Sequence, residues 1–141
     1  MMKSFSDLPA EIRLSHFKFV VAASGADSDL TEEERSVLGF VSRKWGLSQT
    51  EVDQVYRNPA VIEFVISDSR EVCFHQLYDL VEMAIIDSKL KQAEMQMCLG
   101  YAAQLGFPED AVDTVIQGIL EGNQAGKSEE DIQAGLMARL A

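Results

Sequence analysis

The sequence predicts an all-α protein, folded as a compact bundle of about seven to eight helices in one domain, 1–141. Apolar residues recur with a helical period along most of the chain, and no alternating stretch is long enough for a strand. Only three prolines interrupt the 141 residues, which suits long helices. Hydrophobic residues make up 47% and charged residues 25%, so the chain has the composition of a globular protein with its own core.

The first half of the chain contains four segments with helical signals. Two of them open on residue pairs with the spacing of a capping box, Thr31 with Glu34 and Ser48 with Glu51. Gly46 is suited to ending one helix, and Pro59 prevents another from continuing. The expected helices are residues 9–24, 31–45, 48–58 and a short apolar segment at 60–66.

The second half contains similar start and stop signals. Gly106 suits a helix end, and Pro108 suits the first position of the helix that follows. The stretch Gly122 to Lys127 is expected to be a flexible turn, after which Ser128 caps a final helix. The expected helices are residues 70–86, 91–105, a helix that begins at 108, and 128–140.

An internal repeat appears when each residue is compared with the residue 60 positions later. Ten of the forty-seven pairs between residues 11–57 and 71–117 are identical, whereas random pairing at about one match in sixteen would give roughly three. The sequence therefore predicts two helix–acidic turn–helix copies, repeat 1 at about 11–57 and repeat 2 at about 71–117. Two copies are too few for an open solenoid, so we expect them to pack around a pseudo-twofold axis, followed by a C-terminal helix at about 128–140.

Each copy carries the string Asp-Ser-x-Leu-x-x-x-Glu, from Asp27 to Glu34 and from Asp87 to Glu94. An Asp in a turn and a Glu at the start of the next helix can converge on one hard divalent cation, which binds several carboxylate oxygens. The spacing also equals that between loop positions five and twelve of an EF-hand. The EF-hand interpretation fails, because loop positions one and three have no side-chain oxygen in either copy. These positions fall on Ala23, Gly25, Met83 and Ile85.

A metal site built from these turns would therefore be shared by the two copies. It would hold one divalent cation, Ca, Mg or Mn, and no organic cofactor is expected. Lys89 replaces the Asp29 of the first copy and lowers the local negative charge. A purely structural interpretation stays open, because turn preference and the helix dipole favour the same string. The predicted metal ligands are Asp27, Glu34, Asp87 and Glu94.

The strings around these turns resemble the TerB family of tellurite-resistance proteins. The first copy reads A-D-S-D-L-T-x-E-E followed by W-G-L-S, and the second reads M-A-I-I-D-S-K-L-K-x-x-E followed by L-G-F-P. Similar domains include the N-terminal regulatory domain of certain membrane-anchored J-domain co-chaperones, and the resemblance covers roughly residues 15–122. It implies an all-α bundle of about seven helices with pseudo-twofold symmetry, and a role in stress-response or chemical-defence complexes. It also implies an acidic cluster for a divalent cation at Asp27, Glu34, Asp87 and Glu94, although Ser28 and Ser88 stand where the family commonly has glycine.

The net charge of −11 disfavours nucleic acid and anionic membrane surfaces as partners. Cations, basic protein surfaces or partner helices are the expected counterparts, and the oligomeric state is left open. The N-terminal stretch lacks the apolar run of a secretory signal, and no segment approaches eighteen consecutive apolar residues. We therefore expect a cytoplasmic protein with no direct membrane insertion.

No catalytic constellation can be assembled from the sequence. The only histidines, His16 and His75, belong to no ligand-spaced cluster, and Cys73 and Cys98 are expected to be buried free thiols. Trp45 is expected in the core, and a hydrolase would have only the paired acids in its favour. The expected function is a non-enzymatic module that binds a cation or a basic partner. The alternative is a metal-free module that binds a partner through a helical groove, to which Met83, Met95 and Met97 would contribute if they are not core residues.

Overall fold

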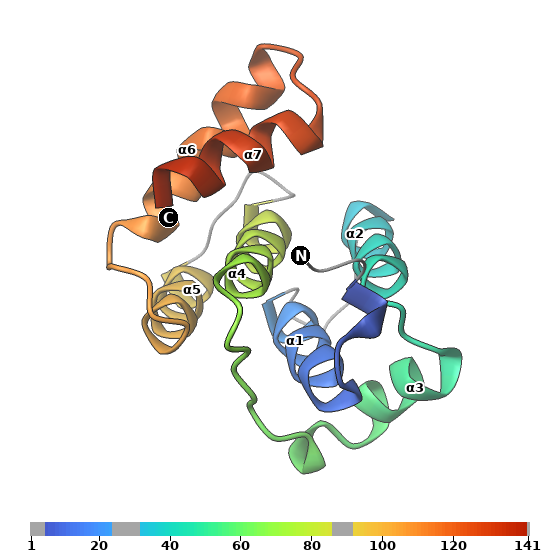
Figure 1. Ribbon diagram of the computed structural model, residues 1–141. Coiled ribbons are helices and arrows are strands. Elements are labelled where there is room, and N and C mark those ends of the chain that lie inside the picture. Colours follow the sequence, from blue (N-terminus) through green and yellow to red (C-terminus); the bar gives the residue numbers. More distant parts are fainter. Residues whose placement is uncertain (1–4, 24–31, 86–91, 141) are drawn as a thin grey trace. The chain divides into compact units, whose positions relative to one another are not determined.

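Helices make up most of the computed structural model, which describes residues 5–23, 32–85 and 92–140 (Figure 1). Within these ranges there are seven α-helices, two short 3-10 helices and no strand, which confirms the predicted all-α class. None of the described helices is long and apolar enough to cross a membrane. The chain divides into two compact units, Met1–Ser67 and Asp68–Ala141, so that repeat 1 lies in the N-terminal unit and repeat 2 in the C-terminal unit.

The N-terminal unit is built around its first long helix, which packs against the two that follow it. Its elements are η1 (Phe5–Asp7), α1 (Ala10–Ala23), α2 (Glu32–Lys44), α3 (Gln49–Arg57) and η2 (Pro59–Val61). A stripe of apolar residues from each helix is buried, as the helical periodicity predicts. The most buried apolar side chains of this unit are Phe17, Val20, Val41, Trp45 and Val55.

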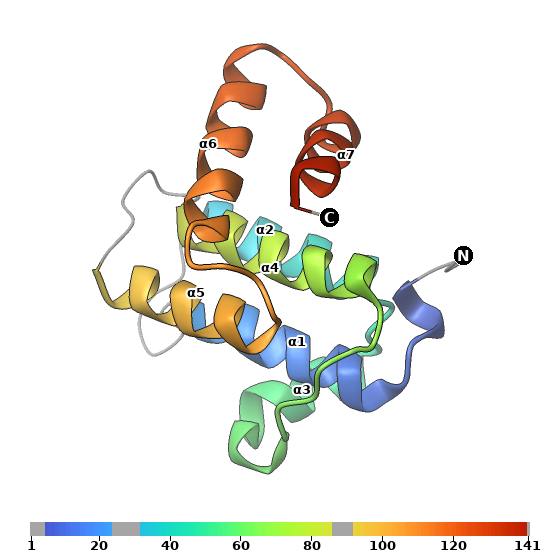
Figure 2. The same cartoon turned by 60° about the vertical axis from the view of Figure 1, so that its left-hand side comes forward.

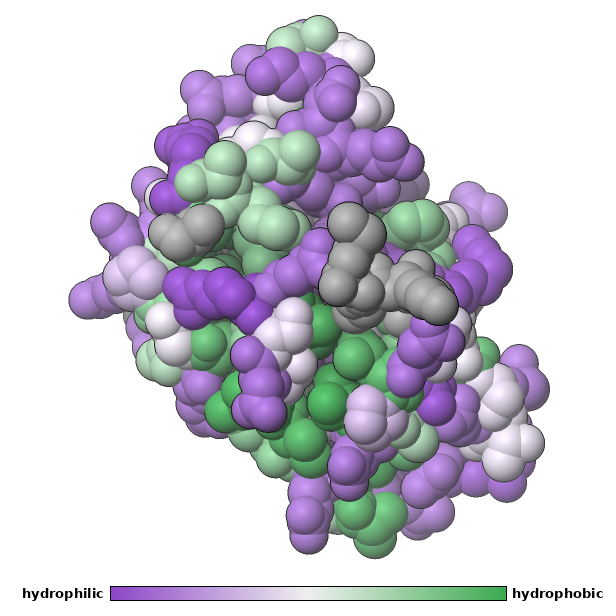
Figure 3. Space-filling model, in the orientation of Figure 1, coloured by the Kyte–Doolittle hydropathy of each residue, from purple (hydrophilic) through white to green (hydrophobic). Residues whose placement is uncertain are grey.

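The C-terminal unit is organised around α4 (Arg70–Ile85), which packs against all three later helices, α5 (Gln92–Gln104), α6 (Ala111–Gln124) and α7 (Glu129–Leu140). Helices α4 and α5 lie side by side, and α6 and α7 form a helical hairpin (Figures 1 and 2). On the face shown in Figure 3, this hairpin presents mainly hydrophilic side chains. Buried residues Ile132 and Leu136 show that α7 docks on its own unit.

The 60-residue offset recurs in the helix boundaries. Helices α1 and α4 begin at residues 10 and 70, and α2 and α5 begin at residues 32 and 92. Helices α2 and α5 also end at matching positions, residues 44 and 104. The offset therefore holds for these boundaries, whereas α3 and α6 begin at residues 49 and 111, which are 62 positions apart.

The same backbone structure closes α2 and α5. Gly46 and Gly106 have φ angles of 66° and 88°, and the amide after each glycine donates to the carbonyl five residues earlier at 2.9 Å. This is the Schellman arrangement, and it confirms both predicted helix stops. An arginine from the first helix of each unit then donates to the glycine carbonyl, Arg13 to Gly46 at 3.2 Å and Arg70 to Gly106 at 3.3 Å.

The capping box predicted at the start of α3 is complete. The Ser48 hydroxyl accepts the Glu51 amide at 3.1 Å, and Glu51 Oε1 accepts the Ser48 amide at 2.9 Å. The same carboxylate oxygen lies 3.1 Å from Arg13 Nη1. The hydrogen bond from the Ser48 backbone lowers the pKa of the Glu51 carboxyl and Arg13 lowers it further, while burial partly opposes them.

Replacing Glu51 with alanine is therefore expected to lower the free energy of unfolding at pH 7 by about 1 kcal/mol. Because the pKa of Glu51 is lowered on folding, its charge stabilises the protein above the ordinary pKa of a glutamate, and this contribution is lost as the pH falls through the folded-state pKa. Urea denaturation at pH 7, 5 and 3 should show the difference shrinking toward acid. A difference that stays constant over this range would contradict the role of the charge.

The apolar segment 60–66 is not the short helix that we expected. Only Pro59–Val61 forms a single 3-10 turn, and the chain is then extended up to α4. Side chains of α1 bind this extended backbone: Lys18 Nζ donates to the Ile62 carbonyl at 2.9 Å, and the Ser15 hydroxyl accepts the Val65 amide at 3.0 Å. The prediction was wrong because these tertiary bonds satisfy the backbone without a helix.

Two predicted boundaries of α6 were also wrong. The helix begins at Ala111 rather than at Pro108, whose carbonyl accepts the Ala111 amide in a preceding turn. The stretch Gly122 to Lys127 is only partly a turn, because α6 continues to Gln124 and the turn after it contains Gly126, which has a φ of 71°. Gly122 is therefore a helical residue, and its packing against α7 gives it a structural role there.

Candidate functional site

The structure describes one side chain of the four predicted metal ligands, that of Glu34. Asp27 and Asp87 lie outside the described residues, and Glu94 belongs to α5 but its side chain is outside them as well. Glu34 lies in the first turn of α2 and is 9% exposed. Within residues 5–23, 32–85 and 92–140, no three His, Cys, Asp or Glu side chains gather into a metal-binding group. The shared cation site therefore stays a prediction.

Glu34 and Glu94 nevertheless have matching places in the fold. Each is the third residue of its helix, since α2 begins at Glu32 and α5 begins at Gln92. At this position a carboxylate is favoured by the positive end of the helix dipole and by unpaired backbone amides. In the sequence, each glutamate also follows the turn predicted to bind the cation, so its place in the helix agrees with either interpretation.

The C-terminal unit buries two thiols, Cys73 and Cys98, and two phenols, Tyr78 and Tyr101. Cys73 and Cys98 are free and buried, as predicted. Burial raises the pKa of the Cys73 thiol, with a smaller opposing effect from Arg70, and burial also raises the pKa values of Tyr78 and Tyr101. A thiol with a raised pKa is a poor nucleophile at neutral pH, so Cys73 is not activated for covalent chemistry.

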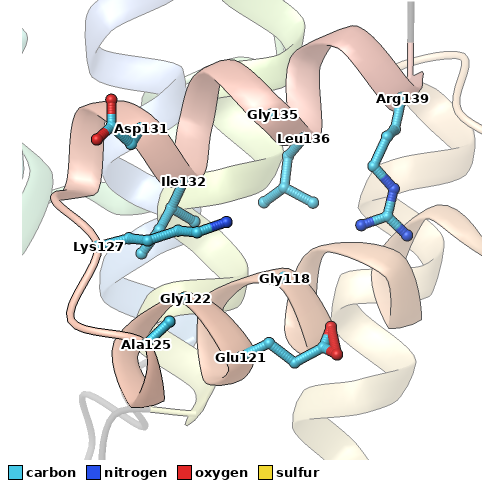
Figure 4. A pocket seen from close by; sticks show the side chains of 10 residues that line it. All are labelled: Gly118, Glu121, Gly122, Ala125, Lys127, Asp131, Ile132, Gly135, Leu136 and Arg139. Atoms are coloured by element: carbon cyan, nitrogen blue, oxygen red, sulfur yellow. The ribbon is translucent and has the colours of Figure 1, made fainter.

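The hairpin of α6 and α7 encloses a cleft of about 400 Å³ (Figure 4). Gly118 and Gly122 from α6 and Gly135 from α7 contribute no side chains to it, and Leu136 projects between the two helices. Its charged residues are of both signs, so the cleft has no net preference for an anion or a cation. They are Glu121, Lys127, Asp131 and Arg139.

A second, more apolar hollow lies in the N-terminal unit, where α1, α2 and α3 meet. We call it the α2–α3 groove; its volume is about 160 Å³. The ring of Phe17 meets the ring of Tyr56 edge-on, with 6.1 Å between their centroids, and burial raises the pKa of the Tyr56 hydroxyl. The groove is lined by Phe17, Arg35, Leu38, Gly39, Ser42, Val52 and Tyr56.

The charged side chains at this groove are basic. Arg35 belongs to the lining, and a Cβ added to Gly39 would lie 3.3 Å from Arg43 Nη1, so the Arg43 guanidinium lies beside the groove as well. None of the lining residues is acidic. Sequence reasoning missed this site, although the spacing Arg35–Gly39–Arg43 along one helix face was visible in the sequence. The contributions from α1 and α3 required the tertiary structure.

The comparisons with known proteins found no relative. No protein-family model, curated protein or solved structure matches the chain.

Proposed function

We propose that this chain is a non-enzymatic, TerB-like module that binds one divalent cation and serves as a scaffold in cytoplasmic stress-response complexes. One observation carries the proposal: α2 and α5 start 60 residues apart, and each places a glutamate at its third position, seven residues after the aspartate of the Asp-Ser-x-Leu-x-x-x-Glu string. The proposed ligands are Asp27, Glu34, Asp87 and Glu94.

The chemistry of these groups suits a hard cation. Calcium, magnesium and manganese prefer carboxylate oxygens, and four carboxylates from two copies would supply a dense negative site. The net charge of −11 further favours cation binding through the field of the whole chain.

Millimolar calcium, magnesium or manganese is expected to raise the melting temperature of the protein, by about 5 °C when the metal stands at ten times its dissociation constant. Thermal melts followed by circular dichroism measure this shift against sodium chloride of equal ionic strength, which removes general screening of the acidic chain. The double variant Asp27→Ala/Asp87→Ala should lose the shift.

A matched control removes two other acids that are also identical at the 60-residue offset, Asp53 and Asp113. The variant Asp53→Ala/Asp113→Ala changes the net charge equally and should keep the metal-dependent shift. If no divalent metal moves the wild-type melting curve beyond the sodium chloride control, the cation part of the proposal is wrong.

The α2–α3 groove favours a second candidate function, a protein-interaction module that needs no metal. Its apolar floor and exposed Tyr56 offer a helical groove of the kind that binds partner segments. In that case the acidic turns only cap helices, and Asp27→Ala/Asp87→Ala would leave partner binding intact while mildly lowering stability.

A further inference from the structure

The floor of the α2–α3 groove is apolar and is formed by core residues. Phe17 and Leu38 are 1% and 4% exposed and form its base, whereas Tyr56, at 46%, stands at its edge. The Ser42 hydroxyl already donates to the Gly39 carbonyl at 2.9 Å, so it does not need a partner from outside. A space of about 160 Å³ with such walls suits one bulky aliphatic or aromatic side chain.

The electrostatics of the groove are opposite to those of the chain as a whole. The protein carries 23 acidic and 12 basic residues, yet the groove is flanked by the exposed Arg35 and Arg43 and is lined by no acid. In the part of the chain that the structure describes, neither guanidinium forms an ion pair. Arg35 and Arg43 lie one helical turn before and after Gly39. Their guanidinium groups therefore place positive charge beside the apolar floor of the groove.

We infer that the α2–α3 groove docks an acidic segment of a partner protein, which inserts one bulky apolar side chain between flanking glutamates or aspartates. The apolar anchor fills the space over Phe17 and Leu38, and its carboxylates pair with Arg35 and Arg43. Guanidinium groups bind carboxylates through two parallel hydrogen bonds. The two arginines therefore select an acidic segment and also determine which of its residues lies over the apolar floor. None of the four proposed cation ligands lines the groove.

The test uses the full chain labelled with ¹⁵N and ¹³C, and short synthetic peptides in which a central Phe, Leu or Met is flanked by glutamates. Titration of these peptides should shift the NMR resonances of Phe17, Leu38, Val52 and Tyr56. Peptides with lysine in place of every glutamate, or with serine in place of the apolar anchor, should leave them unmoved. Arg35→Ala/Arg43→Ala should weaken binding about tenfold, which corresponds to about 1.4 kcal/mol.

Two variants separate docking from folding and from charge alone. Gly39→Leu favours the helix and fills the groove, so it should abolish binding while the protein remains folded. Lys127→Ala/Arg139→Ala removes the same charge at the cleft of α6 and α7 and should leave binding unchanged.

The inference is overturned if the lysine peptides bind as well as the acidic ones, or if Lys127→Ala/Arg139→Ala abolishes binding and the groove variants do not. No resonance shift with any acidic peptide at millimolar concentration would overturn it too. Analytical ultracentrifugation of the protein alone tests whether a second copy of the chain occupies the groove. Self-association that disappears in Arg35→Ala/Arg43→Ala would assign the groove to that second copy and refute the acidic partner.

Discussion

Replacing Trp45 with alanine is expected to lower the free energy of unfolding of the N-terminal unit by about 3–5 kcal/mol. Trp45 is completely buried at the end of α2, and its ring lies 4.6 Å from that of Phe5 and 4.3 Å from that of His16, measured between centroids. Truncation removes a large apolar surface and leaves a cavity, because Gly46 fixes the chain next to it.

Urea denaturation followed by far-ultraviolet circular dichroism measures this loss. Trp45→Phe keeps an aromatic ring against Phe5 and His16, so it should be destabilised clearly less than Trp45→Ala. A loss below about 1 kcal/mol for the alanine variant would show that the site collapses around the missing ring, contrary to the packing described.

Replacing Gly122 with leucine is expected to destabilise the docking of α7, by about 2–3 kcal/mol. A Cβ at Gly122 would lie 2.4 Å from Cγ1 of Ile132, which is 6% exposed, so α7 must shift or Ile132 must leave its position. Helix propensity alone predicts that a glycine-to-leucine change in a helix interior stabilises the protein by about 0.8 kcal/mol. A measured destabilisation would therefore come from the clash with Ile132 and not from helix propensity.

Gly100→Ala in α5 is the matched control, because a Cβ there meets nothing within 4 Å. It should stabilise the protein by about 0.5–1 kcal/mol. Combining Gly122→Leu with Ile132→Ala should recover part of the loss, since the second change removes the atoms that the new side chain meets. Hydrogen exchange along α7 provides the local measurement. Unaltered protection of α7 in Gly122→Leu would contradict the close packing of the two helices.

Features of the fold that depend on neighbouring residues were predictable from the sequence. The capping box of Ser48 and Glu51 and the glycine stops at 46 and 106 are local, because each hydrogen bond spans a few residues. The cap at Ser128 is of the same kind, its hydroxyl accepting the Asp131 amide at 3.1 Å. These signals place the ends of α2, α3, α5 and α7 close to where the structure has them.

Features that depend on distant residues were not predictable in this way. The extended segment after Val61 is held by Ser15 and Lys18, which are 50 and 44 residues away from their partners. Gly122 seemed a turn residue because glycine is common in turns, whereas its function is to let Ile132 approach α6. The candidate sites differ in the same way. The place of Glu34 near the start of its helix follows from the neighbouring sequence. The α2–α3 groove forms only when residues from three helices come together, so the sequence did not predict it.

The single tryptophan gives this chain an optical property of its own. Trp45 is the only tryptophan among the 141 residues, and it is buried in the N-terminal unit. The C-terminal unit has tyrosines but no tryptophan. Intrinsic fluorescence excited at the indole band therefore reports the first half of the chain alone, while circular dichroism reports the helices of both halves. Comparing the two signals during one denaturation reveals whether the halves melt as a cooperative whole or in succession, without any label being attached.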